Sequence, residues 1–242
     1  MLKLLLLLLS GAKLGKLATT GGTMLISVVV YAFVFGWLYA LGFVVLLFVH
    51  EMGHYIAAKQ RGLDVGAPTF IPFVGAWINL KDLPHDAETE AYVGLGGPLL
   101  GSVGALAVYF MAREGPNWLL AVAYSGFFLN LFNLIPISPF DGGRITAVLS
   151  PRIWLLGVPI LGALFLWRPS PMLLVMAILA APQAWKALKY RSDSEEAQTY
   201  YAVPAAKKWE YGLMYLGLAA FLAVMVNDTH NMLEVARTVR GG

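Results

Sequence analysis

The sequence predicts an all-α polytopic membrane protein with about six to seven transmembrane helices and a short membrane-associated β-sheet or re-entrant segment. Three observations support this fold class. Of the 242 residues, 59% are hydrophobic and only 13% are charged, about half the charged share of a soluble domain. No charged residue occurs from Met24 to Val49. Between residues 62 and 90, glycines and prolines interrupt short apolar pieces, which indicates strands or a re-entrant loop and not a helix.

Three regions are expected along the chain. Residues 1–22 form an amphipathic segment at the membrane interface, broken at Thr19 to Gly22. Residues 23–150 form a membrane core of four spans that includes the segment 62–90, and residues 151–242 form C-terminal helices and a tail. A continuous helix over residues 23–58 would be about 52 Å long, which exceeds a bilayer core of about 30 Å. We therefore expect a break between Gly36 and Gly42.

The remaining apolar stretches predict five further spans, at about 91–112, 117–135, 153–167, 171–185 and 209–226. The polar segment from Lys186 to Lys208, between the last two, is expected to be mobile. Prolines near residues 151–171 leave the number of C-terminal spans open.

Positive charges indicate how the chain crosses the membrane. If the N-terminus is cytoplasmic and seven spans alternate, the cytoplasmic segments hold thirteen of the 17 Lys and Arg residues, as the positive-inside rule requires. This predicts a multi-pass protein with His54 and Asp141 toward the cytoplasmic side. We expect its location to be the plasma membrane of a prokaryote. The net charge of +3 is modest and no basic tract is typical of nucleic-acid binding, so we expect the lipid bilayer and no nucleic acid as a partner.

A candidate metal site lies at the end of the second predicted span, in the sequence His50-Glu51-Met52-Gly53-His54. Residues four apart share one face of a helix, so both imidazoles can bind one zinc ion. Glu51 stands beside them and could act as general base. An ionisable residue at membrane depth is costly, which favours a functional role for Glu51.

A catalytic zinc site needs a third protein ligand and an open position for water. The chain has no cysteine, so the third ligand must come from His, Asp or Glu. Asp141 is the best candidate, because its charge at the end of an apolar span is hard to explain without a cation. His85 and His230 are weaker candidates, in a polar loop and in the tail.

Together with a second motif, these residues carry a resemblance to a known family. Asn133 and Pro136 precede Asp141-Gly142 in an Asn-x-x-Pro-x-x-x-x-Asp-Gly pattern, and a Gly-Pro element stands at Gly97-Pro98. Over about residues 24–150 the chain resembles the site-2 protease family of intramembrane zinc metalloproteases, peptidase family M50.

The resemblance implies a zinc metalloprotease that hydrolyses peptide bonds in transmembrane segments of other proteins. It implies one Zn²⁺ per chain held by His50, His54 and Asp141, with Glu51 as base and Asn133 stabilising the oxyanion or positioning the substrate. It also implies that the segment 66–80 offers a strand edge to an unwound substrate, with Gly75, Ala76 and Trp77 as substrate-binding residues. An added strand would hold a substrate extended, with its peptide bonds accessible.

Other interpretations of these residues stay open. Asn130 and the glycines at 96, 97 and 101 are expected to serve helix packing. The chain could be a non-catalytic homologue that binds membrane proteins around a metal-stabilised core, or a metal or proton transporter. The sequence does not identify the substrate, the trigger or the oligomeric state.

Overall fold

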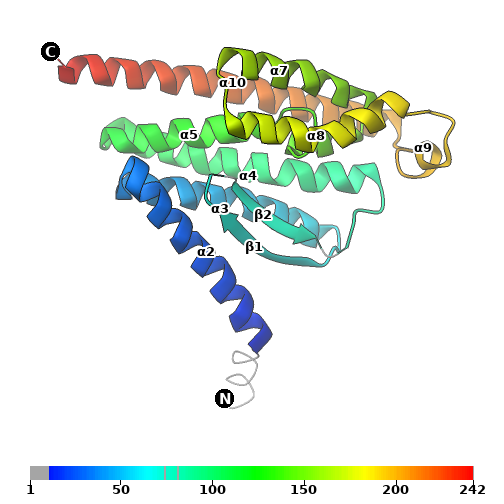
Figure 1. Ribbon diagram of the computed structural model, residues 1–242, viewed down its shortest axis with the longest axis horizontal. Coiled ribbons are helices and arrows are strands. Elements are labelled where there is room, and N and C mark those ends of the chain that lie inside the picture. The colour runs from blue at the N-terminus through cyan, green and yellow to red at the C-terminus, as the bar shows by residue number, and fades with distance from the viewer. Residues whose placement is uncertain (1–10, 74, 81, 242) are drawn as a thin grey trace.

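The computed structural model describes residues 11–73, 75–80 and 82–241. It is helical apart from one two-stranded sheet. Helices α3 (Trp37–Gln60), α4 (Ala87–Glu114), α5 (Asn117–Asn133) and α10 (Ala205–Gly241) run roughly along one direction, and α2 (Gly11–Phe35) leaves this body at a steep angle (Figure 1). This arrangement confirms the prediction of a helical protein with one short β-sheet.

The predicted break in the long apolar run is confirmed, because α2 ends at Phe35 and α3 begins at Trp37. Gly36 joins them with a φ of 87°, a conformation that residues with a Cβ rarely adopt. The predicted break at Thr19 to Gly22 is wrong, since α2 runs through it without interruption. In lipid, backbone groups without an internal hydrogen bond cost several kcal/mol each. This cost exceeds the helix-propensity cost of about 1 kcal/mol per glycine, so the helix continues. Residues 1–10 of the predicted interfacial segment lie outside the described residues.

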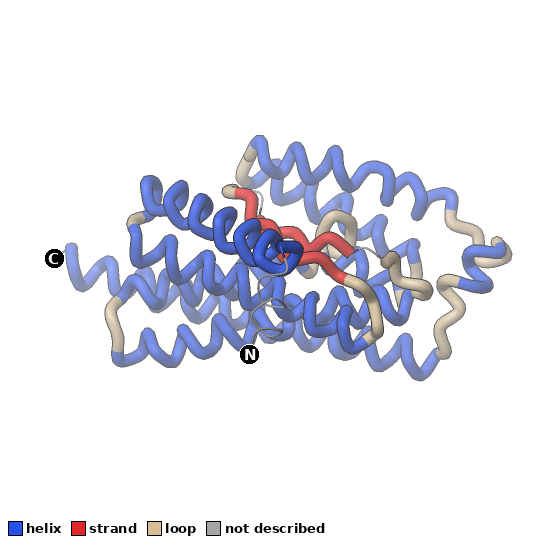
Figure 2. The backbone as a smooth tube through the Cα atoms, turned by 90° about the horizontal axis from the view of Figure 1, so that it is seen from below, coloured by secondary structure: helices blue, strands red, loops and turns tan. Residues whose placement is uncertain are grey.

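The segment after α3 forms an antiparallel hairpin of β1 (Val65–Ile71) and β2 (Gly75–Leu80), as the interrupted apolar pattern predicted. Helix α2 holds the hairpin through three hydroxyl groups. Thr20 donates to the Pro68 carbonyl at 2.7 Å, while Thr23 and Tyr31 accept from the backbone N–H groups of Phe70 and Phe73, at 3.2 and 2.9 Å. In Figure 2 the two strands lie against α2 and cross the long helices.

The C-terminal region consists of a 3₁₀ helix η1 (Pro151–Leu156), α7 (Gly157–Trp167), α8 (Pro171–Lys189), α9 (Glu195–Thr199) and α10. The segment expected to be mobile instead packs against the body. The Ala87 N–H donates to the Tyr200 carbonyl at 2.9 Å, and the Tyr200 hydroxyl donates to Glu90 at 2.6 Å. Burial and the Glu90 carboxylate raise the pKa of Tyr200 well above its usual value, so this hydroxyl remains a donor at physiological pH.

Five of the described helices are long and apolar enough to cross a membrane: α2, α3, α4, α8 and α10. The chain is therefore an integral membrane protein, but the predicted count of six to seven spans is not confirmed. Helix α5 has 17 residues and is about 25 Å long, shorter than a bilayer core of about 30 Å. Its position between α4 and α10 buries Phe127 completely, so it forms part of the core that supports the site.

Candidate metal centre

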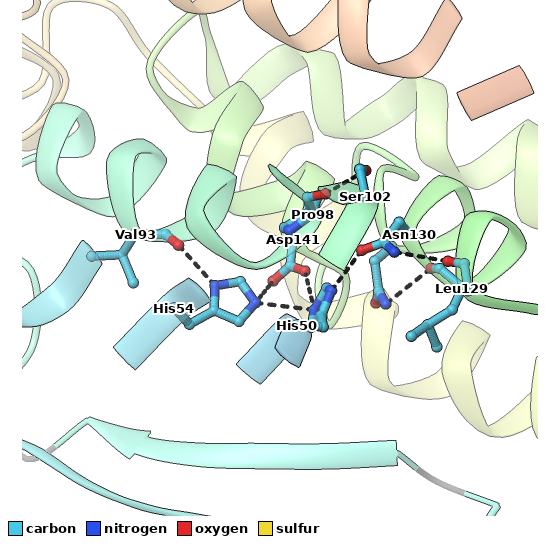
Figure 3. Close-up of polar contacts among 10 residues, drawn as sticks. His50, His54, Val93, Pro98, Ser102, Leu129, Asn130 and Asp141 are labelled. Carbon is cyan, nitrogen blue, oxygen red and sulfur yellow. Dashed lines mark hydrogen bonds and ion pairs between the residues drawn. The ribbon is translucent and has the colours of Figure 1, made fainter. Parts of the chain in front are cut away.

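Helix α3 brings His50 and His54 together. The two residues are one turn apart, both are buried, and their Nε2 atoms lie 3.2 Å from each other. Two imidazoles that turn the same ring nitrogen toward one point can share a metal ion. Figure 3 shows both rings directed at the carboxylate of Asp141.

A backbone carbonyl fixes the tautomer of His54. The Nδ1 atom lies 2.7 Å from the Val93 carbonyl oxygen of α4, which can only accept a hydrogen bond. Nδ1 therefore carries the proton and Nε2 keeps a free lone pair. Gly97, one turn along α4, makes room for this ring: a Cβ atom there would lie within 2.7 Å of Nε2, Cε1 and Cδ2 of His54.

Asn130 of α5 fixes the tautomer of His50 in the same way. Its amide nitrogen donates to the Gly126 carbonyl at 2.7 Å, so its Oδ1 is the atom that lies 2.8 Å from Nδ1 of His50. Oδ1 can only accept, which places the proton on Nδ1 and a lone pair on Nε2 of His50. Gly101 makes room for Asn130, because a Cβ atom there would lie within 3.0 Å of the amide group.

Asp141 completes the group from the start of α6 (Asp141–Ala147). Its Oδ2 lies 3.2 Å from Nε2 of His50 and its Oδ1 lies 3.2 Å from Nε2 of His54. The side chain is buried, with a residue exposure of 8%. The structure thus brings Asp141 together with the two histidines, and its role as a metal ligand stays a prediction.

The spacing of these three groups suits zinc. Ligand atoms at 2.0–2.1 Å from a tetrahedral Zn²⁺ are about 3.3 Å apart, close to the 3.2 Å found here. Two imidazole lone pairs and a carboxylate repel each other in a buried site unless a cation lies between them. The donor set of two nitrogens and one oxygen therefore fits a three-ligand metal site, and it could hold a metal ion.

The other residues predicted for the site lie elsewhere or nearby. Glu51 follows His50 on α3 and is buried, with an exposure of 7%. Asn133, at the end of α5, donates to the Leu129 carbonyl at 3.1 Å, and among the described contacts no hydrogen bond joins it to the three ligands. Gly75 and Ala76 lie at the start of β2, next to Trp77, whose side chain is outside the described part of the chain.

Two kinds of residue were missed by reasoning from the sequence. Asn130 is hydrogen-bonded to His50 and does not serve packing alone, and Gly97 and Gly101 fit around His54 and Asn130 as well as between helices. The spacing carried a partial signal, because Gly97 and Gly101 are four apart and so face the same side of α4. Which side chains they face could not be read from the sequence.

The comparisons with known proteins show a family to which part of this chain is similar. The sequence model of peptidase family M50 matches residues 38–116, which include both histidines and Gly97, the glycine that packs on His54. Over these residues the chain is similar to peptidase family M50. It is 30% identical to a zinc metalloprotease of Methanocaldococcus jannaschii over 119 residues, which cover 45% of this chain and 34% of the relative.

Two further proteins are similar to this chain, and both carry provisional names as zinc metalloproteases. Rip3 of Mycobacterium tuberculosis is 30% identical over 131 residues, covering 48% of this chain and 32% of the relative. A protein of Synechocystis is 31% identical over 131 residues, covering 49% and 33%. The chain thus spans about a third of the length of these curated relatives.

Proposed function

We propose that this protein is an intramembrane zinc metalloendopeptidase that hydrolyses peptide bonds in or near transmembrane segments of other membrane proteins. One observation carries the proposal: three buried, electron-rich ligand atoms from His50, His54 and Asp141 converge at the spacing of zinc ligands. One Zn²⁺ per chain would occupy this centre. The names of the M50 relatives support the same chemistry.

The protein residues supply the proton transfers. Zinc, when bound, lowers the pKa of a coordinated water to about 7 and polarises the peptide carbonyl. Glu51 takes the proton from the attacking water and returns it to the amine nitrogen as the peptide bond breaks. Asn133 would bind the carbonyl oxygen as negative charge develops on it, or position the substrate. Its location at the end of α5, one turn beyond Asn130, is compatible with that role.

The hairpin provides a place for an extended substrate. The sheet has two strands, and the outer backbone groups of β1 already bind the hydroxyls of Thr20 and Thr23 on α2. β2 therefore carries the edge at which a substrate strand would add, beginning at Gly75, Ala76 and Trp77. The hairpin packs on α3, the helix that carries both histidines, with the rings of Phe48 and Phe70 6.4 Å apart.

We infer the plasma membrane of a prokaryote as the location, and the distribution of Lys and Arg supports a metal centre toward the cytoplasmic side. His54 lies less than two turns before the end of α3, where Lys59 stands in the last turn and Arg61 follows the helix. His54 also contacts Val93, less than two turns from the start of α4. The centre is thus close to one end of both helices, the end at which Lys59 and Arg61 lie.

The proposal is tested by cleavage in a defined membrane. Purified protein in liposomes with zinc is given a reporter that contains one transmembrane segment, and cleavage is compared with that of the Glu51→Gln variant. We expect Glu51→Gln to abolish cleavage and to keep about one zinc per chain, because the amide cannot accept the proton and Glu51 is not a ligand. Bound zinc is measured by elemental analysis of the same samples.

Two results would refute the proposal. Undiminished proteolysis by Glu51→Gln would remove Glu51 as the base, and absence of zinc from metal-replete wild type would remove the centre itself. Zinc in the wild type without cleavage of any transmembrane reporter would favour the non-catalytic alternative. A metal or proton transporter would instead move ions across the liposome membrane without cleaving the reporter.

A further inference from the structure

The metal centre is held by two different parts of the protein. Helices α4 and α5 fix the histidines, through the Val93 carbonyl and Asn130. Asp141 follows an irregular loop, residues 134–140, that links α5 to α6. Short turns shape this loop, with the Ile137 N–H donating to the Ile135 carbonyl at 2.8 Å and the Phe140 N–H to the Ile137 carbonyl at 3.0 Å.

The apolar side chains of the loop are buried against the C-terminal region. Ile135, Ile137 and Phe140 belong to one core cluster with Trp154 of η1 and with residues of α8 such as Met176. The contact is close: a Cβ atom on Gly157 would lie 2.6 Å from the Cβ of Ile137. The loop that precedes Asp141 therefore rests on η1, α7 and α8.

Two directional hydrogen bonds add to this packing, one on each side of Asp141. The side-chain oxygen of Gln183 on α8 accepts from the backbone N–H of Ser138, three residues before Asp141. The indole N–H of Trp154 donates to the carbonyl of Gly143, two residues after it, at 2.8 Å. Gln183 and Trp154, here called the bracket, also line one cavity of about 430 Å³ together with Ser138.

We propose that Gln183 and Trp154 are positioning residues that hold Asp141 at the distance a metal ligand requires. The inference rests on the proposed metal centre and assigns a role to residues outside the segment 38–116 that matches the M50 family. The bracket binds the backbone on both sides of Asp141 and has no hydrogen bond to either histidine among the described contacts. Loosening it should free the carboxylate and leave both imidazoles in place.

The test measures zinc affinity of the purified full chain by competition with a chromophoric chelator. Gln183→Met removes the acceptor at similar size, and Trp154→Phe removes the donor but keeps an aromatic ring. Each should weaken zinc binding about 10- to 100-fold, the usual effect of removing a group that orients a ligand. Gln183→Glu instead retains an acceptor oxygen and should keep zinc affinity within about threefold of that of the wild type.

Matched control variants separate the bracket from general effects of the substitutions. Trp209→Phe and Gln198→Met alter exposed side chains of α10 and α9 and should leave zinc affinity unchanged. The visible spectrum of the cobalt-substituted protein provides a second measurement, because it reports the ligand set directly. Gln183→Met should shift the cobalt spectrum toward that of Asp141→Ala.

A double-mutant cycle decides whether the bracket acts through Asp141. In an Asp141→Ala background, Gln183→Met and Trp154→Phe should cause no further loss of affinity. Full additivity, or wild-type affinity in both single variants, would overturn the inference while leaving the metal centre intact. If the wild type binds no zinc, or Asp141→Ala binds it as tightly as the wild type, the proposed centre fails and the inference fails with it.

Discussion

Gly97 gives the sharpest test of the geometry, because replacing it with alanine adds one methyl group directly against a metal ligand. The new Cβ would lie within 2.7 Å of Nε2, Cε1 and Cδ2 of His54, and real Cβ contacts are not that short. The ring has little freedom to move, since Nδ1 is held by the Val93 carbonyl at 2.7 Å. The helices cannot separate easily either, because the backbones of Gly53 and Gly96 are in contact.

The size of the effect follows from this confinement. Forcing an extra methyl into a well-packed site costs about 1–3 kcal/mol. If His54 takes up the strain, zinc affinity should fall about 5- to 150-fold. Gly217→Ala on α10 is the matched control: its Cβ would meet nothing within 4 Å, and it should stabilise the helix by about 0.5–1 kcal/mol without changing zinc affinity.

The assay is chelator competition on wild type, Gly97→Ala and Gly217→Ala, with thermal unfolding of the metal-free proteins alongside. Gly97→Ala should also lower the melting temperature, and it should lower it less in a His54→Ala background, where the ring is absent. Zinc affinity within twofold of wild type in Gly97→Ala would refute the close packing of Gly97 on the ligand. An equal loss of stability with and without the His54 ring would refute the assignment of the strain to that ring.

Three further predictions follow from contacts around the site. Asn130→Ala removes the acceptor for Nδ1 of His50 and should weaken zinc binding about 10- to 100-fold; affinity within twofold of wild type would contradict this tautomer assignment. A ligand at 100 times its Kd stabilises the folded protein by about 2.7 kcal/mol, so removing zinc with a chelator should lower the melting temperature. This decrease should be clearly smaller in Asp141→Ala, and equal decreases in both proteins would argue against Asp141 as a ligand. Tyr31→Phe deletes the hydrogen bond from the Phe73 N–H and should lower the free energy of unfolding by about 1 kcal/mol. Amide hydrogen exchange in residues 65–80 should become faster while zinc affinity stays constant. Unchanged exchange would contradict the anchoring of the hairpin by α2.

The parts of the fold that depend on local chemistry could be predicted from the sequence. The break at Gly36 follows from the length of the apolar run and the need for a positive φ. The hairpin follows from glycines and prolines that a helix does not tolerate. The threonines and glycines at 19–22 led to a wrong prediction of a helix break. Local pattern alone predicted the break, whereas tertiary and membrane constraints keep α2 helical there.

The candidate site was predictable as far as residue type and spacing determine it. His50 and His54 are neighbours on any helix, so their convergence required only that α3 form. Asp141 could be chosen by its charge, but its 3.2 Å contacts depend on the loop and on η1 and α8, which no local pattern describes. Asn130 could not be assigned to His50 because the contact depends on how α5 packs against α3.

The separate origins of the ligands also set an order for assembly during synthesis. His50 and His54 leave the ribosome well before Asp141, with a delay on the order of ten seconds at usual rates of translation. During that interval the nascent chain holds two imidazoles but no carboxylate partner, and α4 and α5 are only then arriving beside them. If the proposed centre binds zinc, capture of the ion by all three ligands would therefore follow the synthesis of Asp141.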